Sequence, residues 1–137
     1  MNGILIESLA GLGGFCTHFA AALAYLALFS MIYCKTTPYD ELKLVRQGNV
    51  APAISFGGAL LGFVLPLHSA ITHSVSLADM LIWALVAMVV QITVFSVVRL
   101  IFKGLVRDIE NGHTAAATLL AFFSVAIGIL NAASMTY

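Results

Sequence analysis

Four long runs of apolar residues, separated by short polar stretches, dominate the sequence. They cover residues 15–34, 50–71, 77–98 and 114–133. Each has the roughly 20 residues that a helix needs to cross about 30 Å of membrane hydrocarbon. The runs are apolar on every side, whereas a strand of a membrane barrel alternates over about 10 residues. Because backbone groups in lipid must bond within their own segment, the pattern predicts an all-α membrane protein with four transmembrane helices.

The composition of the chain also points to lipid as its surroundings. Hydrophobic residues make up 61% of the 137 residues and charged residues 9%, against about 45–50% and about 25% in a soluble domain. So few charges would not cover the surface of a small soluble domain. The net charge of zero excludes a basic nucleic-acid binder. We therefore expect the lipid bilayer as a partner and no nucleic acid.

The positive charges fall in only two of the polar stretches, between the first and second runs and between the third and fourth. The six residues are Lys35, Lys43, Arg46, Arg99, Lys103 and Arg107. Cytoplasmic loops of membrane proteins carry such an excess of Lys and Arg. The sequence therefore predicts that both connectors face the cytoplasm and that both termini face outward (N-out/C-out).

Residues 1–14 precede the first run and carry no Lys or Arg, which argues against a secretory signal. Glu7 and three glycines interrupt their apolar pattern. We interpret residues 4–12 as a short helix on the outer surface that leads into the first span. The alternative is a first span that begins earlier and is strongly tilted.

The two halves of the sequence resemble each other at an offset of 64 residues. Residues 48–53 (GNVAPA) match residues 112–117 (GHTAAA), with identical residues at the first, fourth and sixth positions. Each half then contains two spans and one charged connector. We expect two helical hairpins, residues 1–71 and 72–137, arranged as a parallel repeat, because two spans return the chain to the side where it began.

The first connector has the residue order of a helix start. Threonines precede Pro38, and Asp40 and Glu41 follow it, an order typical of a first helical turn. The apolar residues that follow predict a short helix at the membrane surface, with its cations turned to water or to anionic headgroups. Residues 103–110 look similar. The alternative is a solvated connector, and the basic connectors are a candidate site for a peripheral cytoplasmic partner.

Small residues recur at intervals of four on the second and fourth spans, at Gly58 and Gly62 and at Ser124 and Gly128. This spacing forms a smooth stripe on which another helix packs closely. It does not tell whether that helix belongs to the same chain or to a second copy. Packing within the chain and a homo-oligomer contact both stay open.

Few polar side chains lie inside the spans, where they are costly and often functional. Gln91 is the deepest strongly polar residue, and we expect its amide to bond to another helix; lining a pore is the alternative. His18, His68 and Asn131 lie toward the outer ends, where they would form a polar vestibule if they converged. Pro66 removes a helical hydrogen bond, and the expected kink either serves packing or acts as a hinge.

The sequence carries no enzyme signature. It lacks the motifs of metalloproteases, serine hydrolases and phosphate-binding loops. No carboxylate lies in the middle of a span, which lowers the case for a proton-coupled carrier. A metal site would need His18, His68 and His73 to converge, and no ligand spacing supports it. We therefore expect no catalysis, no metal and no cofactor.

Motifs along nearly the whole chain point to one family. They are residues 35–41 (KTTPYDE), 48–51 (GNVA), Gly58, Gly62, 66–70 (PLHSA) and 128–137 (GILNAASMTY). In this order they resemble the YjfL-like family of bacterial inner-membrane proteins, which is built on domain of unknown function 350. The resemblance implies a four-span plasma-membrane protein made of two copies of one hairpin. It implies no established activity, cofactor or catalytic residue.

Two functions from different classes fit these patterns. The first is a non-enzymatic scaffold that acts as a homo-oligomer, or a membrane-stress component, a role that the resemblance alone implies. The second is a small oligomeric channel or transporter with its pore between subunits, because four helices enclose little space. The small-residue stripes and the lack of buried charge favour the first function. Gln91, Pro66 and the outer polar residues favour the second.

Overall fold

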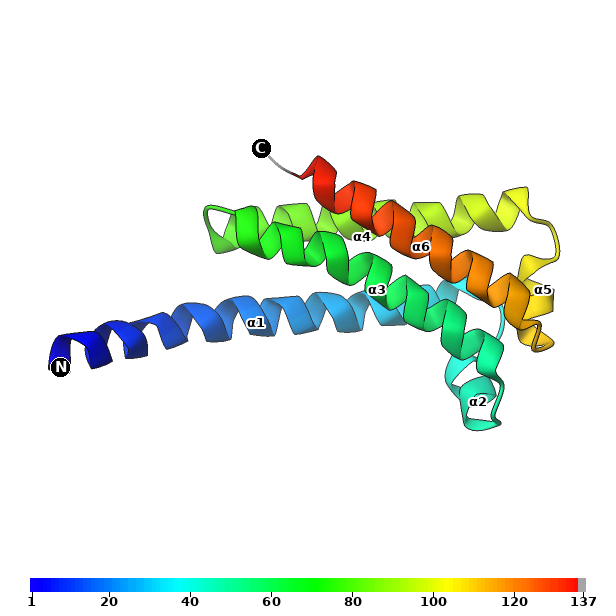
Figure 1. The fold of residues 1–137 in the computed structure, drawn as a ribbon, viewed down its shortest axis with the longest axis horizontal. Coiled ribbons are helices and arrows are strands. Elements are labelled where there is room, and N and C mark those ends of the chain that lie inside the picture. The colour runs from blue at the N-terminus through cyan, green and yellow to red at the C-terminus, as the bar shows by residue number, and fades with distance from the viewer. Residues whose placement is uncertain (136–137) are drawn as a thin grey trace.

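The computed structural model describes residues 1–135, and its regular elements are all helices (Figure 1). They are α1 (Asn2–Thr36), α2 (Glu41–Arg46), α3 (Val50–His73), α4 (Leu77–Ile101), α5 (Leu105–Glu110) and α6 (Thr114–Ser134). Helices α1, α3, α4 and α6 are long and apolar enough to cross a membrane. The prediction of an all-helical chain with four such helices is therefore confirmed. The end of the predicted second hairpin, residues 136–137, lies outside the described residues.

Three of the four long helices begin where the sequence predicted, at Val50, Leu77 and Thr114. Polar residues mark two of these starts. The side-chain oxygens of Asn49 and Ser76 accept hydrogen bonds from backbone N–H groups in the first turns of α3 and α4. Such caps satisfy donors that have no partner inside the helix. The apolar runs therefore begin directly after residues that are suited to start a helix.

Helix α1 differs from the expectation, because it begins at Asn2 and not near residue 15. One helix of 35 residues continues through the glycines that were expected to break it. Glycine permits a bend but does not impose one, since its N–H still donates to the preceding turn. Glu7 is exposed on the helix surface. The prediction of a separate outer helix over residues 4–12 is therefore wrong, and the earlier start that was the alternative is present.

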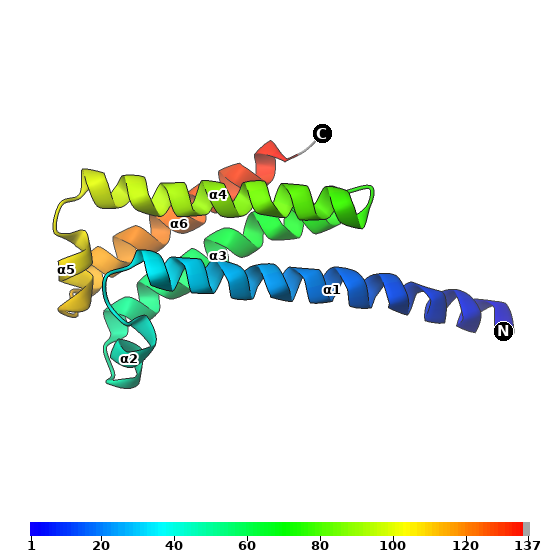
Figure 2. The ribbon, with the colours of Figure 1, turned by 180° about the vertical axis from the view of Figure 1, so that it is seen from behind.

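Helices α3 and α6 form the centre of the fold. They cross in contact with each other, and α4 packs beside both of them (Figure 1). Helix α1 is peripheral, and it runs alongside α4 (Figure 2). We call the end of the bundle that carries the turn between α3 and α4, residues 74–76, the turn end. The N-terminal part of α1 extends past this end (Figure 2).

The C-terminal half of α1 attaches it to the bundle through aromatic side chains. Phe29 stacks on Phe63 of α3, with ring centroids 4.6 Å apart. The ring of Tyr33 lies 5.0 Å from that of Phe95 on α4. Aromatic pairs at such separations stabilise beyond the area that they bury. Because Phe29 and Tyr33 are the buried residues of α1 among those described, the N-terminal half contributes little to this packing.

The short helices α2 and α5 lie at the opposite end of the bundle, which we call the connector end (Figure 1). Each is six residues long and is followed by a glycine with φ of 85°, Gly48 or Gly112. Glycine adopts this left-handed conformation without strain. Asn49 joins the two connectors, because its Nδ2 donates to the carbonyl oxygen of Glu110 over 2.9 Å. Each connector thus contains the expected short helix, and Asp40 caps the first one.

Candidate functional site

The contact between α3 and α6 contains the four small residues that the sequence singled out, Gly58, Gly62, Ser124 and Gly128. A methyl group on Gly58 would overlap Ala121. One on Gly62 would overlap the backbone of Ser124, and one on Gly128 would overlap the backbone of Gly62. The two helix backbones therefore approach as closely as glycine allows. The stripe is occupied within one chain and is not exposed to a second copy.

Gln91 of α4 lies where α4 meets this contact. Its Nε2 donates to the carbonyl oxygen of Ser124 over 3.2 Å, and the same nitrogen faces Gly62. Its Oε1 is buried and has no hydrogen-bond partner among the described residues. The amide thus links α4 to α6 from inside the bundle, where three helices enclose it.

Pro66 is fully buried on α3, and the helix continues through it to His73. Because proline has no N–H, the carbonyl oxygen of Gly62 lacks its helical donor. That oxygen faces the Cα of Gly128 on α6, a geometry typical of a weak Cα–H···O contact. Pro66 therefore contributes to the packing of α3 on α6, and a hinge at Pro66 stays a prediction.

The outer polar residues each have separate surroundings. His18 Nδ1 lies 2.8 Å from the carbonyl oxygen of Gly14 in its own helix. Asn131 Nδ2 donates to the carbonyl oxygen of Ala87 over 3.5 Å, and His68 is exposed. Within the described chain, no hydrogen bond joins any two of these three side chains, and no group of His, Cys, Asp and Glu is arranged to hold a metal ion. The expected vestibule has no support in these contacts.

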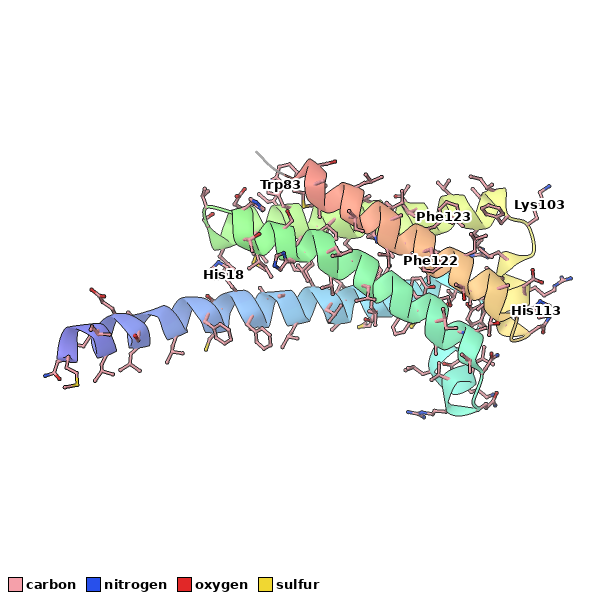
Figure 3. The ribbon with its side chains drawn as sticks, in the orientation of Figure 1. His18, Trp83, Lys103, His113, Phe122 and Phe123 are labelled. Carbon is pink, nitrogen blue, oxygen red and sulfur yellow. The ribbon has the colours of Figure 1, made fainter. Side chains whose placement is uncertain are left out.

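An apolar groove separates α1 from the turn end of α3. Gly14, Phe15 and His18 of α1 line it, together with Ile71 of α3. The side chain of His18 extends from α1 toward α3 (Figure 3). The groove marks the level at which α1 passes the turn end, so that residues 2–13 of α1 lie beyond the bundle.

A second polar site lies at the connector end, where α2 meets the bundle. Glu41, the first residue of α2, is 1% exposed. Neither of its carboxylate oxygens has a hydrogen-bond partner in the part of the chain that is described, and the same holds for the hydroxyls of Tyr33 and Tyr39. The three side chains interact electrostatically. We call Glu41, Tyr33 and Tyr39 the connector-end cluster.

Burial controls the protonation of this cluster. It raises the pKa of the Glu41 carboxyl from its ordinary value of 4.5 to about 7, and the neighbouring Thr37 hydroxyl opposes part of this rise. Burial, followed by the charge of Glu41, raises the pKa of Tyr39 well above its ordinary range. At neutral pH, Tyr39 is therefore a neutral phenol, whereas Glu41 is present in both protonation states.

Sequence reasoning missed the connector-end cluster. It expected Glu41 in the first turn of a solvated or surface helix, and this expectation is wrong because the side chain is buried. The reason is that an acid in a polar connector is normally in water. The signal that points to burial is the internal similarity: at the offset of 64, Glu41 corresponds to Leu105, an apolar residue.

Comparison with known proteins gives the family. The DUF350 family model, "Domain of Unknown Function (DUF350)", matches residues 7–135. The chain is 40% identical over 123 residues to the UPF0719 inner membrane protein YjfL of Escherichia coli (strain K12), a match that covers 90% of this chain and 93% of that protein. It is 26% identical over 121 residues to the UPF0719 transmembrane protein YshE of Bacillus subtilis (strain 168), covering 86% and 90%. No solved structure matches the chain.

The helices and these matches together define an all-helical integral membrane protein. The chain belongs to the DUF350 family, as the resemblance in its motifs predicted. The predicted location in an inner membrane, crossed several times, is likewise confirmed by the names of the relatives and by the four apolar helices.

Proposed function

We propose that the chain is a non-enzymatic scaffold of the bacterial inner membrane that assembles as a homo-oligomer. The observation that carries this proposal is the α1 overhang, residues 2–13, which extends past the turn end of its own bundle (Figure 2). Its large apolar side chains are all exposed: Ile4, Leu5, Ile6, Leu9 and Leu12. Outside the hydrocarbon, exposed apolar side chains that gather on one segment are typical of a protein contact.

Helix α1 is longer than the membrane hydrocarbon is thick, so the apolar side chains of the overhang need a protein partner. At 1.5 Å per residue, a helix of 35 residues is about 52 Å long, against about 30 Å of hydrocarbon. A tilt that immersed all of α1 would also tilt α4, which runs alongside it (Figure 2). A second copy packed against the overhang covers these side chains without that tilt. Since the small-residue stripe is occupied within the chain, α1 is the surface that supports assembly.

The two connectors support an assembly with one basic, cytoplasmic face. Helices α2 and α5 have equal length, lie 64 positions apart and are each followed by a positive-φ glycine. These features support a parallel repeat of two hairpins, residues 1–71 and 72–137. All the lysines and arginines lie in or beside the connectors, and Lys103 extends outward there (Figure 3). This charge supports the N-out/C-out orientation and a peripheral cytoplasmic partner on the basic face.

Deleting residues 2–13 tests the proposal. We expect the full chain to be oligomeric in lipid nanodiscs and in mild detergent, and the shortened chain to be monomeric with the helices of its bundle still folded. Native mass spectrometry gives the subunit number. Leu9→Ala and Leu61→Ala form a matched pair, because these side chains are 63% and 60% exposed but only Leu9 lies on the overhang. A monomeric full chain, or an oligomer that survives the deletion, would overturn the proposal.

The alternative of a pore between subunits has a different requirement. Such a pore needs polar groups on the outer surface of the bundle, whereas Gln91 is enclosed by α3, α4 and α6. Ion flux through proteoliposomes that is lost in Gln91→Leu would favour the channel over the scaffold. Silent vesicles that contain a defined oligomer would favour the scaffold.

A further inference from the structure

Helix α2 is attached to the bundle in an unusual way. All six of its residues are described, and Glu41 is the only one whose side chain is buried. The neighbouring Leu42 and Val45 are exposed, and Leu44 is half-buried. The anchor of a short helix is normally an apolar side chain, because burying a charged group without a partner is costly. Here the anchor is a carboxyl group.

The second connector shows what an ordinary anchor looks like. Helix α5 is held by two apolar side chains, Leu105 and Ile109. Leu105 is the first residue of α5, as Glu41 is the first residue of α2. The two side chains are similarly buried, at 5% and 1% exposure. The chain therefore carries an acid where the corresponding helix carries leucine.

The groups around Glu41 offer no positive charge. The nearby titratable groups are Tyr33 and Cys34 of α1, Tyr39 and Asp40 of the connector, and Glu110 of α5. None of these carries a positive charge. From α4, Arg99 donates to the carbonyl oxygen of Thr36 over 3.0 Å. In residues 1–135, no Lys, Arg or His forms an ion pair with Glu41.

Two of the nearby hydroxyl groups donate to backbone carbonyl oxygens, whereas those of Tyr33 and Tyr39 have no partner among the described residues. Thr37 Oγ1 donates to the carbonyl oxygen of Cys34 over 3.0 Å, and Ser55 Oγ donates to that of Pro52 over 3.2 Å. An ionised Glu41 would therefore be a buried charge without a paired cation, and only neutral hydroxyl groups, those of Thr37, Tyr33 and Tyr39, lie near it. A buried charge of this kind is costly. The carboxylate therefore either binds a proton and becomes neutral or moves out of the site into water.

We propose that Glu41 is a proton-binding site that controls the docking of α2 on the bundle. With the proton on a carboxylate oxygen, the neutral side chain packs between α2 and the bundle as Leu105 does in α5. When the carboxyl group releases its proton to water at the connector end, the carboxylate follows it into water and α2 separates from the bundle. The rise of the Glu41 pKa to about 7 sets this change near neutral pH.

Infrared spectroscopy of the full chain in nanodiscs tests the proton directly. At about pH 6 an exposed glutamic acid is almost fully ionised, so a carboxylic-acid carbonyl band there reports a buried, protonated group. We expect this band at about pH 6, its loss by about pH 8, and its absence in Glu41→Gln. Glu110→Gln is the matched control, because Glu110 is an exposed acid of the other short helix, and it should keep the band. A wild-type chain without the band at about pH 6 would overturn the proposal.

Amide hydrogen exchange tests the release of α2. After correction for the intrinsic effect of pH, exchange in residues 41–46 should rise about tenfold per pH unit between about pH 5 and about pH 7 and then level off. In Glu41→Leu, which copies the anchor of α5, exchange in α2 should be slow and independent of pH. A similar rise in Glu41→Leu, or none in the wild type, would contradict the proposal.

A third measurement distinguishes a proton from a metal cation. The exchange series is repeated with sodium chloride in place of potassium chloride and at several concentrations of each salt. We expect the same pH dependence throughout. A dependence on the sodium concentration at fixed pH would mean that a metal cation occupies the site, and the assignment to a proton would then be wrong.

Discussion

At the scale of single residues, the contact between α3 and α6 depends on glycines, which have no side chain to separate the two backbones. Gly58, Gly62 and Gly128 let the two backbones touch, and the amide of Gln91 fits beside Gly62. In lipid, helices gain nothing from burying apolar surface against each other, so close packing and hydrogen bonds carry the association. The energy of this fold is therefore concentrated at a few positions.

Gly62→Ala should destabilise the protein by about 1–3 kcal/mol. The added methyl group would overlap the backbone of Ser124 and displace the Gln91 amide. Gly57→Ala is the matched control, because a methyl group on Gly57 meets open space on the same helix. Helix content followed by circular dichroism during titration with a denaturing detergent measures both variants. Equal stabilities would show that the close approach of α3 and α6 is unimportant.

Glu41 should make the stability of the chain depend on pH. Its folded-state pKa of about 7 lies above the ordinary value of 4.5, so between these values the folded chain holds a proton that the unfolded chain has released. The free energy of unfolding should fall as the pH rises through this window, by about 3 kcal/mol in total, and then level off. Detergent titrations at four pH values measure this slope.

Glu41→Gln supplies the comparison for the pH series, because glutamine has nearly the same shape and does not titrate. It should keep the stability that the wild type has at low pH and should lose the Glu41 part of the slope. Other titrating groups affect both proteins equally, so the difference between the two curves isolates Glu41. Parallel curves would mean that Glu41 does not contribute to the pH dependence.

At the scale of helices, Asn49 performs two tasks that its counterpart does not. Its Oδ1 accepts from the N–H of Ala51 over 3.3 Å, and its Nδ2 donates to the carbonyl oxygen of Glu110. It therefore caps α3 and holds the two connectors together. His113 stands at the same place before α6 but makes no side-chain cap; its imidazole lies 3.4 Å from Asp108 in an exposed pair.

Asn49→Ala should cost about 1–2 kcal/mol of stability, because it removes a cap and a hydrogen bond between connectors. His113→Ala is the control from the corresponding position, and it should cost less than about 1 kcal/mol, since exposed ion pairs contribute little. The same detergent titration measures both variants. If His113→Ala is the more destabilising of the two, the cap assignment of Asn49 is incorrect.

The sequence predicts a helix start correctly where a polar capping residue precedes an apolar run. Asn49 and Ser76 precede apolar runs, so the starts of α3 and α4 could be placed correctly. The start of α1 could not, because glycine allows a helix to bend without deciding whether it does. The four-residue spacing identified the packing stripe around Gly62, but spacing carries no information on which helix covers it. Glu41 was missed because burial depends on how a connector folds back, which no local pattern encodes.

At the scale of the whole molecule, charge and apolar length divide the protein into two unlike ends. The connector end carries all the lysines and arginines, together with the buried carboxyl group of Glu41. The turn end carries none of them, and of residues 1–135 the apolar overhang of α1 continues beyond it (Figure 2). If the connector end is cytoplasmic, the proton that Glu41 binds comes from the cytoplasm, and the overhang assembles copies on the other side.

Labelling of single cysteines tests this orientation, in a chain whose own Cys16 and Cys34 are replaced by alanine. Gln47→Cys places an exposed thiol in the first connector, and Val75→Cys places one in the turn between α3 and α4. A thiol reagent that does not cross membranes should label position 75 but not position 47 in intact spheroplasts, and the reverse in everted vesicles. The reason is that translocating the six cations of the connectors outward is unfavourable during insertion. Permeabilised membranes, in which both positions should react, control for local reactivity. Labelling of position 47 from outside would show that the molecule has the opposite orientation, in which Glu41 exchanges its proton with the external solution.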